Sequence, residues 1–467
     1  MIQFIQRHIK IFLVILIVKS ILAGMIIHLS LCAQGIDQDG FYLTAGDTRS
    51  YFEPLEHLAT QGKYFYLNLD GEKVIAGRTP FYGLLYFIGH SFLNKESILS
   101  LYVLLQVLLE AISVLLLWDL IRQIVQRKWI QWFGLLLLTV STYHTFWSCK
   151  LIPESLALSC LIILFWLLSR ARPRAIALGI LLLILTGLKP YLGILAVVVS
   201  VLIIKREKSL SSRKTWRSLI ALWAPLFLFV MVWGGRNYAI TGKVIPFTEA
   251  LSGYSFTEAE LAFRKFMAAK GESQEYWDKK AESSFYYGRE SVYTLDELYT
   301  DSYITSDTLL TIRQHLSQIA RGEAVEEERD RKIAGIIERT TSHYKETHPS
   351  HLLTGSLDRV KDLIFHSGSY YLPIAKDSPC YSEWQWIFKL MQSLFYYLFT
   401  CFGLLSLFLI KDWRVQFMPW YLIALFCIVL QFIELRFFLL AYPSLVLGSF
   451  YLTGRLHRSL KPPSSPI

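Results

Sequence analysis

Long apolar segments alternate with short basic clusters along most of this 467-residue chain. A helix needs about 20 apolar residues to cross the hydrocarbon core of a bilayer, and fewer where it is short or buried in protein. Ten segments approach this length: 11–33, 98–121, 129–147, 154–169, 175–188, 190–204, 216–235, 385–410, 416–433 and 437–453. Since 53% of the residues are hydrophobic and 18% are charged, a soluble protein of this size is excluded. The sequence predicts an α-helical polytopic membrane protein with about ten transmembrane helices.

Basic residues gather at alternate ends of these segments. The clusters are Arg7/Lys10, Arg122/Arg127/Lys128, Arg170/Arg172/Arg174, 205–217, Lys411/Arg414 and Arg455/Arg458/Lys461. The positive-inside rule assigns all of them to the cytoplasm, so we expect a multi-pass protein of the cytoplasmic (inner) cell membrane with both termini cytoplasmic. The net charge of +10 lies in these loops. No separate basic patch interleaved with aromatic residues accompanies it, which argues against nucleic-acid binding.

The first apolar segment and the cysteines have simple interpretations. Segment 11–33 is longer than the apolar part of a secretory signal, and we expect it to be an uncleaved first span. Cys32 follows Leu31, a bulky residue where a lipoprotein signal would have a small one. The six cysteines are scattered, mostly in apolar runs, without metal-ligand spacing. We therefore expect small apolar residues rather than a disulfide framework or a metal site.

This topology divides the chain into four parts. Residues 1–235 form an N-terminal transmembrane module whose first outer loop covers 34–97. A second outer segment, 236–384, contains the helix-like stretches 257–285 and 306–340 and is expected to be mostly helical. Residues 385–455 form the C-terminal transmembrane helices, and 456–467 form a cytoplasmic tail. The short apolar piece 80–93 carries Gly83 and Gly89 and is predicted to be interfacial or re-entrant.

Polar residues gather at the predicted outer membrane face. They are Asp47, Arg49, Arg78, Lys150, Glu154, Lys189, Arg236, Glu434 and Arg436. A lone Lys or Arg at the end of a span is usually a snorkelling anchor. On residue types alone, Asp47 and its neighbours would be a solvated turn. Snorkelling, however, does not explain three carboxylates beside apolar segments, Asp47, Glu154 and Glu434. Their common location instead indicates a site.

Several cations and a carboxylate at headgroup level suit a lipid phosphate. Arginine binds phosphate through a planar fork of donors, and lysine adds a point charge. A carboxylate can remove a proton from an acceptor hydroxyl as that hydroxyl attacks an activated carbon. A sugar linked to a lipid phosphate fits this arrangement, since its tail would lie in the bilayer and its anomeric carbon just outside.

The first outer loop resembles that of the GT-C superfamily, whose members are multi-span glycosyltransferases that use polyprenyl-phosphate sugars. It is most similar to the bacterial branch related to protein O-mannosyltransferases and the lipid A aminoarabinose transferase. The matching residues in the loop are Asp47, Tyr51, Leu58, Gly62, Lys63, Tyr64, Arg78 and Pro80. Further matches are Pro153-Glu154-Ser155, Lys189-Pro190, Arg236-Asn237-Tyr238, His348-Pro349 and Glu434-Leu435-Arg436-Phe437. Segment 257–345 contributes nothing to the resemblance.

The resemblance implies roles for individual residues. Asp47 is implied as the catalytic base and Arg78 as a ligand of the donor phosphate. The remaining residues assigned to the donor pocket are Arg49, Tyr51, Glu154, Lys189, Arg236 and Arg436. The aminoarabinose branch has a second acidic residue where this chain has Thr48, and its arginine stands one position nearer the tyrosine than Arg49 does.

The expected function is the inverting transfer of one sugar from an undecaprenyl-phosphate-type donor to a glycan, lipid or protein acceptor on the extracytoplasmic face. No cofactor is expected, and a divalent metal stays an open alternative, because Arg and Lys can stabilise the leaving phosphate without one. One alternative is a lipid or polysaccharide transporter, which would have charged or broken helices near mid-membrane and repeated halves. Another is a protein like the O-antigen ligases and polymerases, which lack an early acidic loop.

Overall fold

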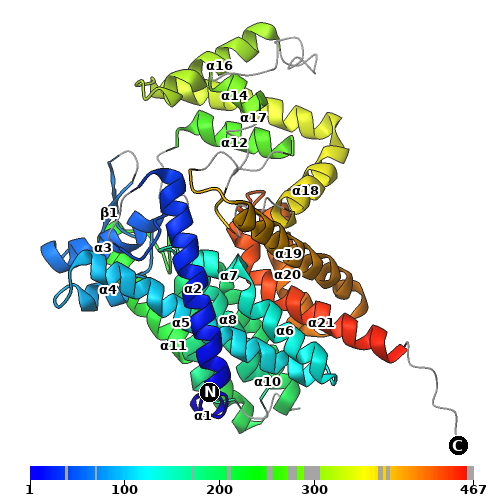
Figure 1. The fold of residues 1–467 in the computed structure, drawn as a ribbon. Helices are drawn as coiled ribbons and strands as arrows, with labels where there is room; N and C mark the ends of the chain where they lie inside the picture. Colours follow the sequence, from blue (N-terminus) through cyan, green and yellow to red (C-terminus); the bar gives the residue numbers. More distant parts are fainter. Residues whose placement is uncertain are drawn as a thin grey trace, which may run out of the picture. The chain divides into compact units, whose positions relative to one another are not determined.

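The computed structural model describes residues 1–36, 40–68, 71–170, 173–207, 212–249, 256–271, 281–288, 305–365, 372–374 and 379–459. Most of these residues are helical (Figure 1). The chain forms two compact units. The first comprises Met1–Tyr254, Ser367–Gln416 and Leu439–Ile467, and the second comprises Ser255–His366 and Phe417–Phe438. The second unit therefore begins later than the predicted segment 236–384 and includes part of the predicted C-terminal helices.

The first unit contains the apolar helices. They are α1 (Ile2–Arg7), α2 (Ile9–Gln34), α3 (Thr48–Gln61), α4 (Leu84–Gly89), α5 (Lys95–Ile124), α6 (Lys128–Val140), α7 (Thr142–Ser148), α8 (Glu154–Leu168), α9 (Ala175–Leu188), α10 (Ile194–Glu207), α11 (Arg213–Thr241), α19 (Glu383–Leu409) and α21 (Tyr442–Ser459). A 3₁₀ turn, η1 (Pro190–Gly193), joins α9 to α10. The short strands β1 (Tyr66–Leu67) and β2 (Lys73–Val74) pair antiparallel, with Tyr66 opposite Val74. Helix α20 (Trp413–Leu422), the π-helix η3 (Ile423–Val429) and the 3₁₀ helix η4 (Leu435–Ala441) follow α19, and their residues Phe417–Phe438 belong to the second unit.

Five helices among the described residues are long and apolar enough to cross a membrane. They are Ile9–Gln34, Lys95–Ile124, Arg213–Thr241, Glu383–Leu409 and Arg436–Arg455. Shorter apolar helices cover Glu154–Leu168, Ala175–Leu188 and Trp413–Val429. The protein is thus a helical protein with membrane-spanning character, while the predicted number of about ten spans is not reproduced.

One of the predicted spans has an interrupted backbone. Segment 129–147 divides into α6 and α7 because Ser141 is extended, with φ −66° and ψ 127°. No proline or glycine marks this break; instead the Ser141 carbonyl accepts a hydrogen bond of 2.6 Å from Lys19 Nζ. The junction at Lys189-Pro190, in contrast, falls between two predicted segments and separates α9 from η1.

Helix α11 carries the most exposed apolar surface of the five long helices. Only 11% of its most apolar window is buried inside the protein. The exposed side chains include Trp216, Ile220, Phe227, Leu228, Met231 and Val232. A continuous apolar surface of this extent on a helix is costly in water and is stable against lipid.

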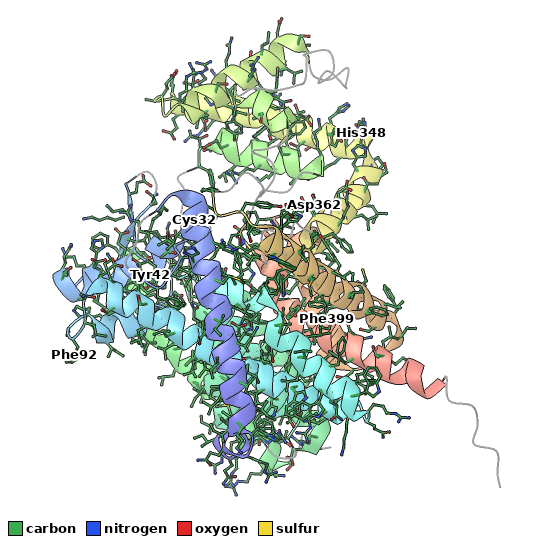
Figure 2. All side chains as sticks on the ribbon, viewed as in Figure 1. Cys32, Tyr42, Phe92, His348, Asp362 and Phe399 are labelled. Atoms are coloured by element: carbon green, nitrogen blue, oxygen red, sulfur yellow. A yellow bond between two sulfur atoms is a disulfide. The ribbon has the colours of Figure 1, made fainter. Side chains whose placement is uncertain are left out.

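Segment 80–93 does not form a long helix. It holds only the six residues of α4, followed by a turn. Its apolar side chains nevertheless face outward: Leu84, Leu85 and Ile88 are about half exposed, and Phe92 is 83% exposed. Figure 2 shows Phe92 projecting from this turn. The geometry agrees with an interfacial segment better than with a span.

The second unit is built on helices α12 (Glu258–Ala269), α14 (Ala281–Tyr286), α16 (Ser306–Ala320), α17 (Glu327–Thr347) and α18 (Pro349–Ile364). Thr257 and Glu260 form a capping box at the start of α12. The predicted stretch 306–340 is divided by Gly322, whose φ of 71° ends the helical path after α16. Buried Phe263, Leu316 and Ile337 belong to the core of this unit.

The expectation for the cysteines is wrong in one respect. Cys32, in the last turn of α2, forms a disulfide with Cys380, and their Cα atoms are 6.2 Å apart. Both lie in the first unit. A stretch of 348 residues separates them in sequence, so only the tertiary fold brings the two thiols together. The four other cysteines are free.

Candidate functional site

Asp47 and Arg78 meet in the first outer loop. Asp47 is the N-cap residue of α3, and Arg78 follows the β1–β2 hairpin. Arg78 Nη2 lies 3.4 Å from Asp47 Oδ1, and the two side chains are 27% and 33% exposed. The pair is therefore held by the fold yet open to solvent. Carboxylates are favoured at helix N-termini, where backbone N–H groups are unsatisfied.

Neighbouring side chains fix the direction of Arg78. Its Nε donates a hydrogen bond of 3.0 Å to Ser50 Oγ. Its guanidinium stacks on the Tyr51 ring, 4.8 Å from the ring centroid. Tyr64 donates to the Arg78 carbonyl at 3.1 Å. The predicted order Asp47, Tyr51, Tyr64 and Arg78 thus corresponds to a single set of contacts.

A second ion pair joins Glu154 and Lys189. Lys189 Nζ lies 2.6 Å from Glu154 Oε1, and both side chains are almost fully buried. Glu154 is the first residue of α8, and Lys189 is the C-cap of α9. Each charge complements the partial charge at its own helix end. A buried pair of this kind stays stable only while both partners are present.

Two hydrogen bonds connect the backbone around the first pair to the backbone around the second. Thr48, directly after Asp47, donates from Oγ1 to the Leu151 carbonyl at 3.1 Å. Thr79, directly after Arg78, donates from Oγ1 to the Gly187 carbonyl. Leu151 lies three residues before Glu154 in the sequence, and Gly187 lies two residues before Lys189. These contacts bring the two ion pairs into the same region of the first unit.

The Tyr82 side chain lies close to residues of both ion pairs' surroundings. Its ring centroid lies 5.4 Å from that of Tyr51, which stacks on Arg78. Burial raises the pKa of the Tyr82 phenol well above its usual value, with further contributions from Tyr102, Glu154 and Tyr51. Tyr82 is thus neutral at physiological pH and lies near a residue of each ion pair's surroundings, Tyr51 and Glu154.

Glycine at position 187 permits the loop to approach α9 closely. A Cβ atom there would collide with the Phe81 ring. Phe81 follows Pro80, which belongs to the predicted motif, so the residue next to this motif packs against Gly187 near the end of α9. A larger residue at position 187 would push the loop and Thr79 away from the end of α9.

Arg236 holds the loop by its backbone. Its Nη1 donates to the Ile75 carbonyl at 2.9 Å and its Nη2 to the Tyr64 carbonyl at 3.0 Å. The guanidinium also stacks on the rings of Tyr64 and Trp233. Tyr64 in turn contacts Arg78, so Arg236 supports the Asp47–Arg78 pair from the α11 side. Its predicted contact with a phosphate stays a prediction.

Two predicted residues point to other partners. Arg49 is 65% exposed and pairs with Glu53 along α3 at 2.5 Å. Arg436 belongs to the second unit, where it pairs with Glu434. The structure therefore joins four of the predicted residues in two ion pairs, places Tyr51 and Arg236 around the exposed pair, and gives Arg49 and Arg436 separate carboxylate partners.

Sequence reasoning missed a buried ionic group inside the helices. Lys19, near the middle of α2, lies 2.8 Å from Glu110, near the middle of α5, and both side chains are at most 1% exposed. Glu110 accepts hydrogen bonds from Thr145 at 2.7 Å and from Ser148 at 2.8 Å. The sequence signal was Lys19 within the apolar segment 11–33 and Glu110, together with Asp119, within the apolar segment 98–121.

This group continues toward the α7–α8 turn. Ser148 Oγ and Ser155 Oγ are 2.7 Å apart, and His144 Nε2 lies 3.2 Å from Ser155 Oγ. A small cavity of about 10 Å³, roughly one water molecule in size, is lined by Lys19, His144 and Tyr442 among others. Among the described residues, no group of three or more His, Cys, Asp or Glu side chains is arranged to hold a metal ion.

The geometry defines the chain as a helical protein of membrane-spanning character with a partly exposed acid–arginine pair in its first loop. No protein-family model matches the sequence, and neither the curated proteins nor the solved structures include a significant match. The resemblance to the GT-C superfamily stays a prediction from the motifs of the loop.

Proposed function

We propose that this protein is a membrane glycosyltransferase of GT-C type. It would move one sugar from a polyprenyl-phosphate donor to a glycan, lipid or protein acceptor on the extracytoplasmic face, with Asp47 as general base. The observation that carries this proposal is the Asp47–Arg78 pair, because a carboxylate and a guanidinium 3.4 Å apart remain partly open to solvent. A base and a phosphate ligand are the two groups that the transfer requires.

In the proposed reaction the donor phosphate binds Arg78 through charge-assisted hydrogen bonds. This competes with the Asp47 carboxylate for the guanidinium and leaves Asp47 available to accept a proton. The acceptor hydroxyl attacks the anomeric carbon as its proton passes to Asp47. The new C–O bond forms on the face opposite the breaking bond to phosphate, so the anomeric configuration inverts. The polyprenyl phosphate departs with the electron pair, stabilised by Arg78.

The surroundings support a lipid-linked donor. The exposed apolar side chains of α4 and Phe92 lie in the same loop as Arg78. A polyprenyl tail is apolar and would share the membrane environment that such side chains favour. The buried Glu154–Lys189 pair is linked to this loop through Thr48 and Thr79, and because Glu154 neutralises Lys189, the positive charge for the phosphate would come from Arg78.

One observation favours the transporter alternative. The Lys19–Glu110 pair lies near the middle of two long apolar helices, and ionisable residues at such depth often mark transport pathways. Transport would relocate a lipid-linked or free solute without breaking the sugar–phosphate bond. Product analysis therefore separates the two candidates.

The decisive experiment reconstitutes the full chain in liposomes with labelled polyprenyl-phosphate sugars and a mixture of acceptors. Asp47→Asn should lower sugar transfer by about 10²–10⁴-fold, the usual contribution of a general base. Glu53→Gln is the matched control, since Glu53 is a carboxylate of the same helix that pairs with Arg49. Full transfer by Asp47→Asn would remove it from the mechanism. Movement of intact donor across the membrane, with no transfer by the native chain, would favour transport.

A further inference from the structure

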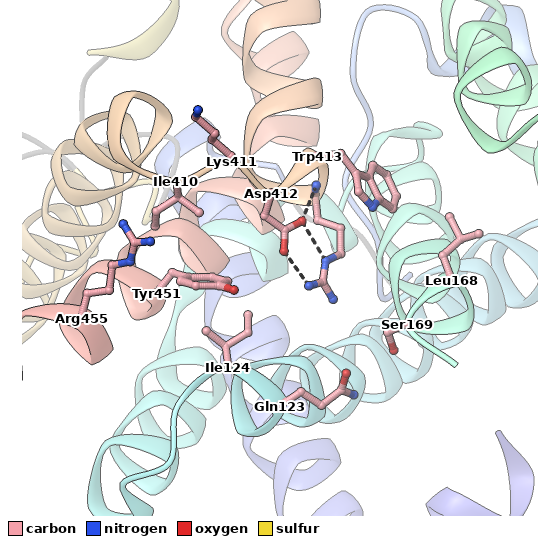
Figure 3. Close-up of a pocket in the computed structure, with 11 residues that line it drawn as sticks. Gln123, Ile124, Leu168, Ser169, Ile410, Lys411, Asp412, Trp413, Tyr451 and Arg455 are labelled. Carbon is pink, nitrogen blue, oxygen red and sulfur yellow. Dashed lines mark hydrogen bonds and ion pairs between the residues drawn. The ribbon is translucent and has the colours of Figure 1, made fainter. Parts of the chain in front are cut away.

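A second polar site lies at helix ends remote from the Asp47 loop. A cavity of about 660 Å³ opens between the last residues of α5, the end of α8, the α19–α20 connection and α21. In Figure 3 Tyr451 is drawn between Asp412 and Arg455, with Gln123 and Ile124 below them. All of its lining residues belong to the first unit. Its volume falls within the range typical of small-molecule sites.

The cavity lies at the opposite end of α5 from the first loop. Tyr42 of that loop hydrogen-bonds Glu96, the second residue of α5, whereas the cavity is lined by Gln123 and Ile124 at its last turn. A helix of 30 residues is about 45 Å long, close to the thickness of a bilayer with its headgroups. Likewise α8 begins with Glu154 and ends at Leu168, beside the cavity. The cavity therefore lies at headgroup level on the face opposite Asp47.

The charge of the cavity is positive. Three basic side chains, Lys411, Arg414 and Arg455, line it together with one carboxylate, Asp412. Arg414 largely neutralises Asp412, because its Nη2 and Nε reach the two carboxylate oxygens at 2.6 and 3.1 Å. The Asp412 Oδ1 also accepts the Arg414 backbone N–H at 2.9 Å. The Asp412 carboxylate is thus occupied by Arg414. The remaining charge of the cavity comes from Lys411 and Arg455 and is positive.

The lining also combines aromatic and polar groups. Trp413 and Tyr451 provide rings, and Ser169 and Gln123 provide hydrogen-bonding groups. Aromatic side chains with polar tips are typical of membrane–water interfaces. Basic pockets between transmembrane helices bind the phosphates of anionic lipid headgroups.

We propose that this cavity binds the phosphate headgroup of an anionic glycerophospholipid. Lys411 and Arg455 attract the phosphodiester, Tyr451 offers a hydroxyl donor, and Trp413 packs against the glycerol region. The acyl chains extend along the apolar surfaces of the adjoining helices. The Asp412–Arg414 pair excludes a divalent cation from the carboxylate and keeps the site selective for anions. This proposal is independent of the glycosyltransferase proposal, since it concerns the other membrane face and involves no transfer chemistry.

The test uses the full chain, delipidated in mild detergent and examined by native mass spectrometry. Phosphatidylglycerol is the anionic probe and phosphatidylcholine the zwitterionic one. The native chain should retain phosphatidylglycerol in preference, and Lys411→Gln/Arg455→Gln should lower its retention at least about tenfold, as expected for two basic contacts. Arg127→Gln/Lys128→Gln is the matched control, because these exposed basic residues stand on the α5–α6 connection outside the cavity.

Further measurements test whether the bound phosphate belongs to a lipid, and they check that the variants are folded. Lys411→Gln alone removes an exposed side chain and should lower retention by several-fold without a change in the thermal midpoint, whereas Lys411→Arg should keep it. Equal loss in the control variant would overturn the proposal, since any surface charge would then act alike. Equal retention of both lipids would also overturn it. Saturation by inorganic phosphate alone, with no competition from phosphatidylglycerol, would show a site for a free anion instead of a lipid.

Discussion

The Lys19 ammonium and the Glu110 carboxylate lie 2.8 Å apart with no more than 1% of either side chain exposed. Lys19 also donates to the Ser141 carbonyl, at the break between α6 and α7. Glu110 accepts a hydrogen bond from the hydroxyl of Ser148 at the end of α7. One ion pair therefore fixes both ends of the short α7 helix, and α7 leads directly into the turn that accepts Thr48.

Breaking this pair on one side should destabilise the protein strongly. Glu110→Gln leaves the Lys19 charge buried without its counterion, at a cost of about 3–5 kcal/mol. Lys19→Met/Glu110→Leu removes both charges and should recover most of the loss. Thermal unfolding in nanodiscs measures the difference, with Glu56→Gln as control because Glu56 pairs with Lys95 on the exposed surface. A Glu110→Gln variant as stable as the native chain would contradict this role.

Thr48 should not tolerate the second acidic residue of the aminoarabinose branch. Thr48 is 9% exposed; its Oγ1 accepts the Ala45 N–H and donates to the Leu151 carbonyl. In Thr48→Asp an ionised carboxylate would face that carbonyl with no proton to donate. We expect a lower thermal midpoint and loss of at least about 1–3 kcal/mol. Thr48→Ser keeps both hydrogen bonds and should remain close to native; equal stability of all three proteins would refute the contact.

The stability of the second unit should fall in acid through Asp330. Burial by itself would raise the pKa of this carboxyl, but hydrogen bonds from His315, the Ala259 N–H and Thr257 outweigh it and lower the pKa below 3.8. Because the folded pKa is the lower one, the stabilisation is complete above the unfolded value near 3.8 and disappears as the pH falls through the folded value.

The pH dependence of unfolding checks this effect. Between neutral pH and pH 3 the native chain should lose more stability than Asp330→Asn, which has no carboxyl to protonate at this position. Asp307→Asn is the control, because Asp307 is exposed at the first turn of α16. Parallel pH curves for the native chain and Asp330→Asn would argue against the linkage.

The disulfide offers a test of topology. Disulfides form in oxidising compartments, so a Cys32–Cys380 bond requires both residues to reach the extracytoplasmic side. In Cys32→Ser, the released Cys380 thiol should react with a membrane-impermeant maleimide added to intact cells. Arg127→Cys, at a predicted cytoplasmic loop, should react only after the membrane is opened. Labelling of Arg127→Cys in intact cells would reverse the predicted orientation.

Much of the architecture could be predicted because it depends on local composition. The apolar segments and their basic flanks predict where long helices begin and end, and Lys189-Pro190 marks the break before η1. The meeting of Asp47 and Arg78 followed from the motif order in a single loop. These signals lie within a short stretch of sequence and do not depend on distant partners.

The remaining features depend on tertiary contacts. Nothing local marks Ser141 as a break, since the Lys19 ammonium that binds its carbonyl comes from another helix. Lys19 and Glu110 each look like an isolated defect in an apolar run until the fold brings them together. Arg49 was assigned to the donor pocket because of its neighbours in sequence, yet its nearest carboxylate is Glu53, one helical turn along α3.

The Cys32–Cys380 disulfide also sets an order of events during synthesis. With 348 residues between the two cysteines, a ribosome adding about 5–20 residues per second needs about 20–70 s to make the second after the first. Throughout that interval the end of α2 carries a reduced thiol that can react with other cysteines. The covalent link between the end of α2 and the segment leading to α19 can therefore form only after nearly all of the chain has been synthesised.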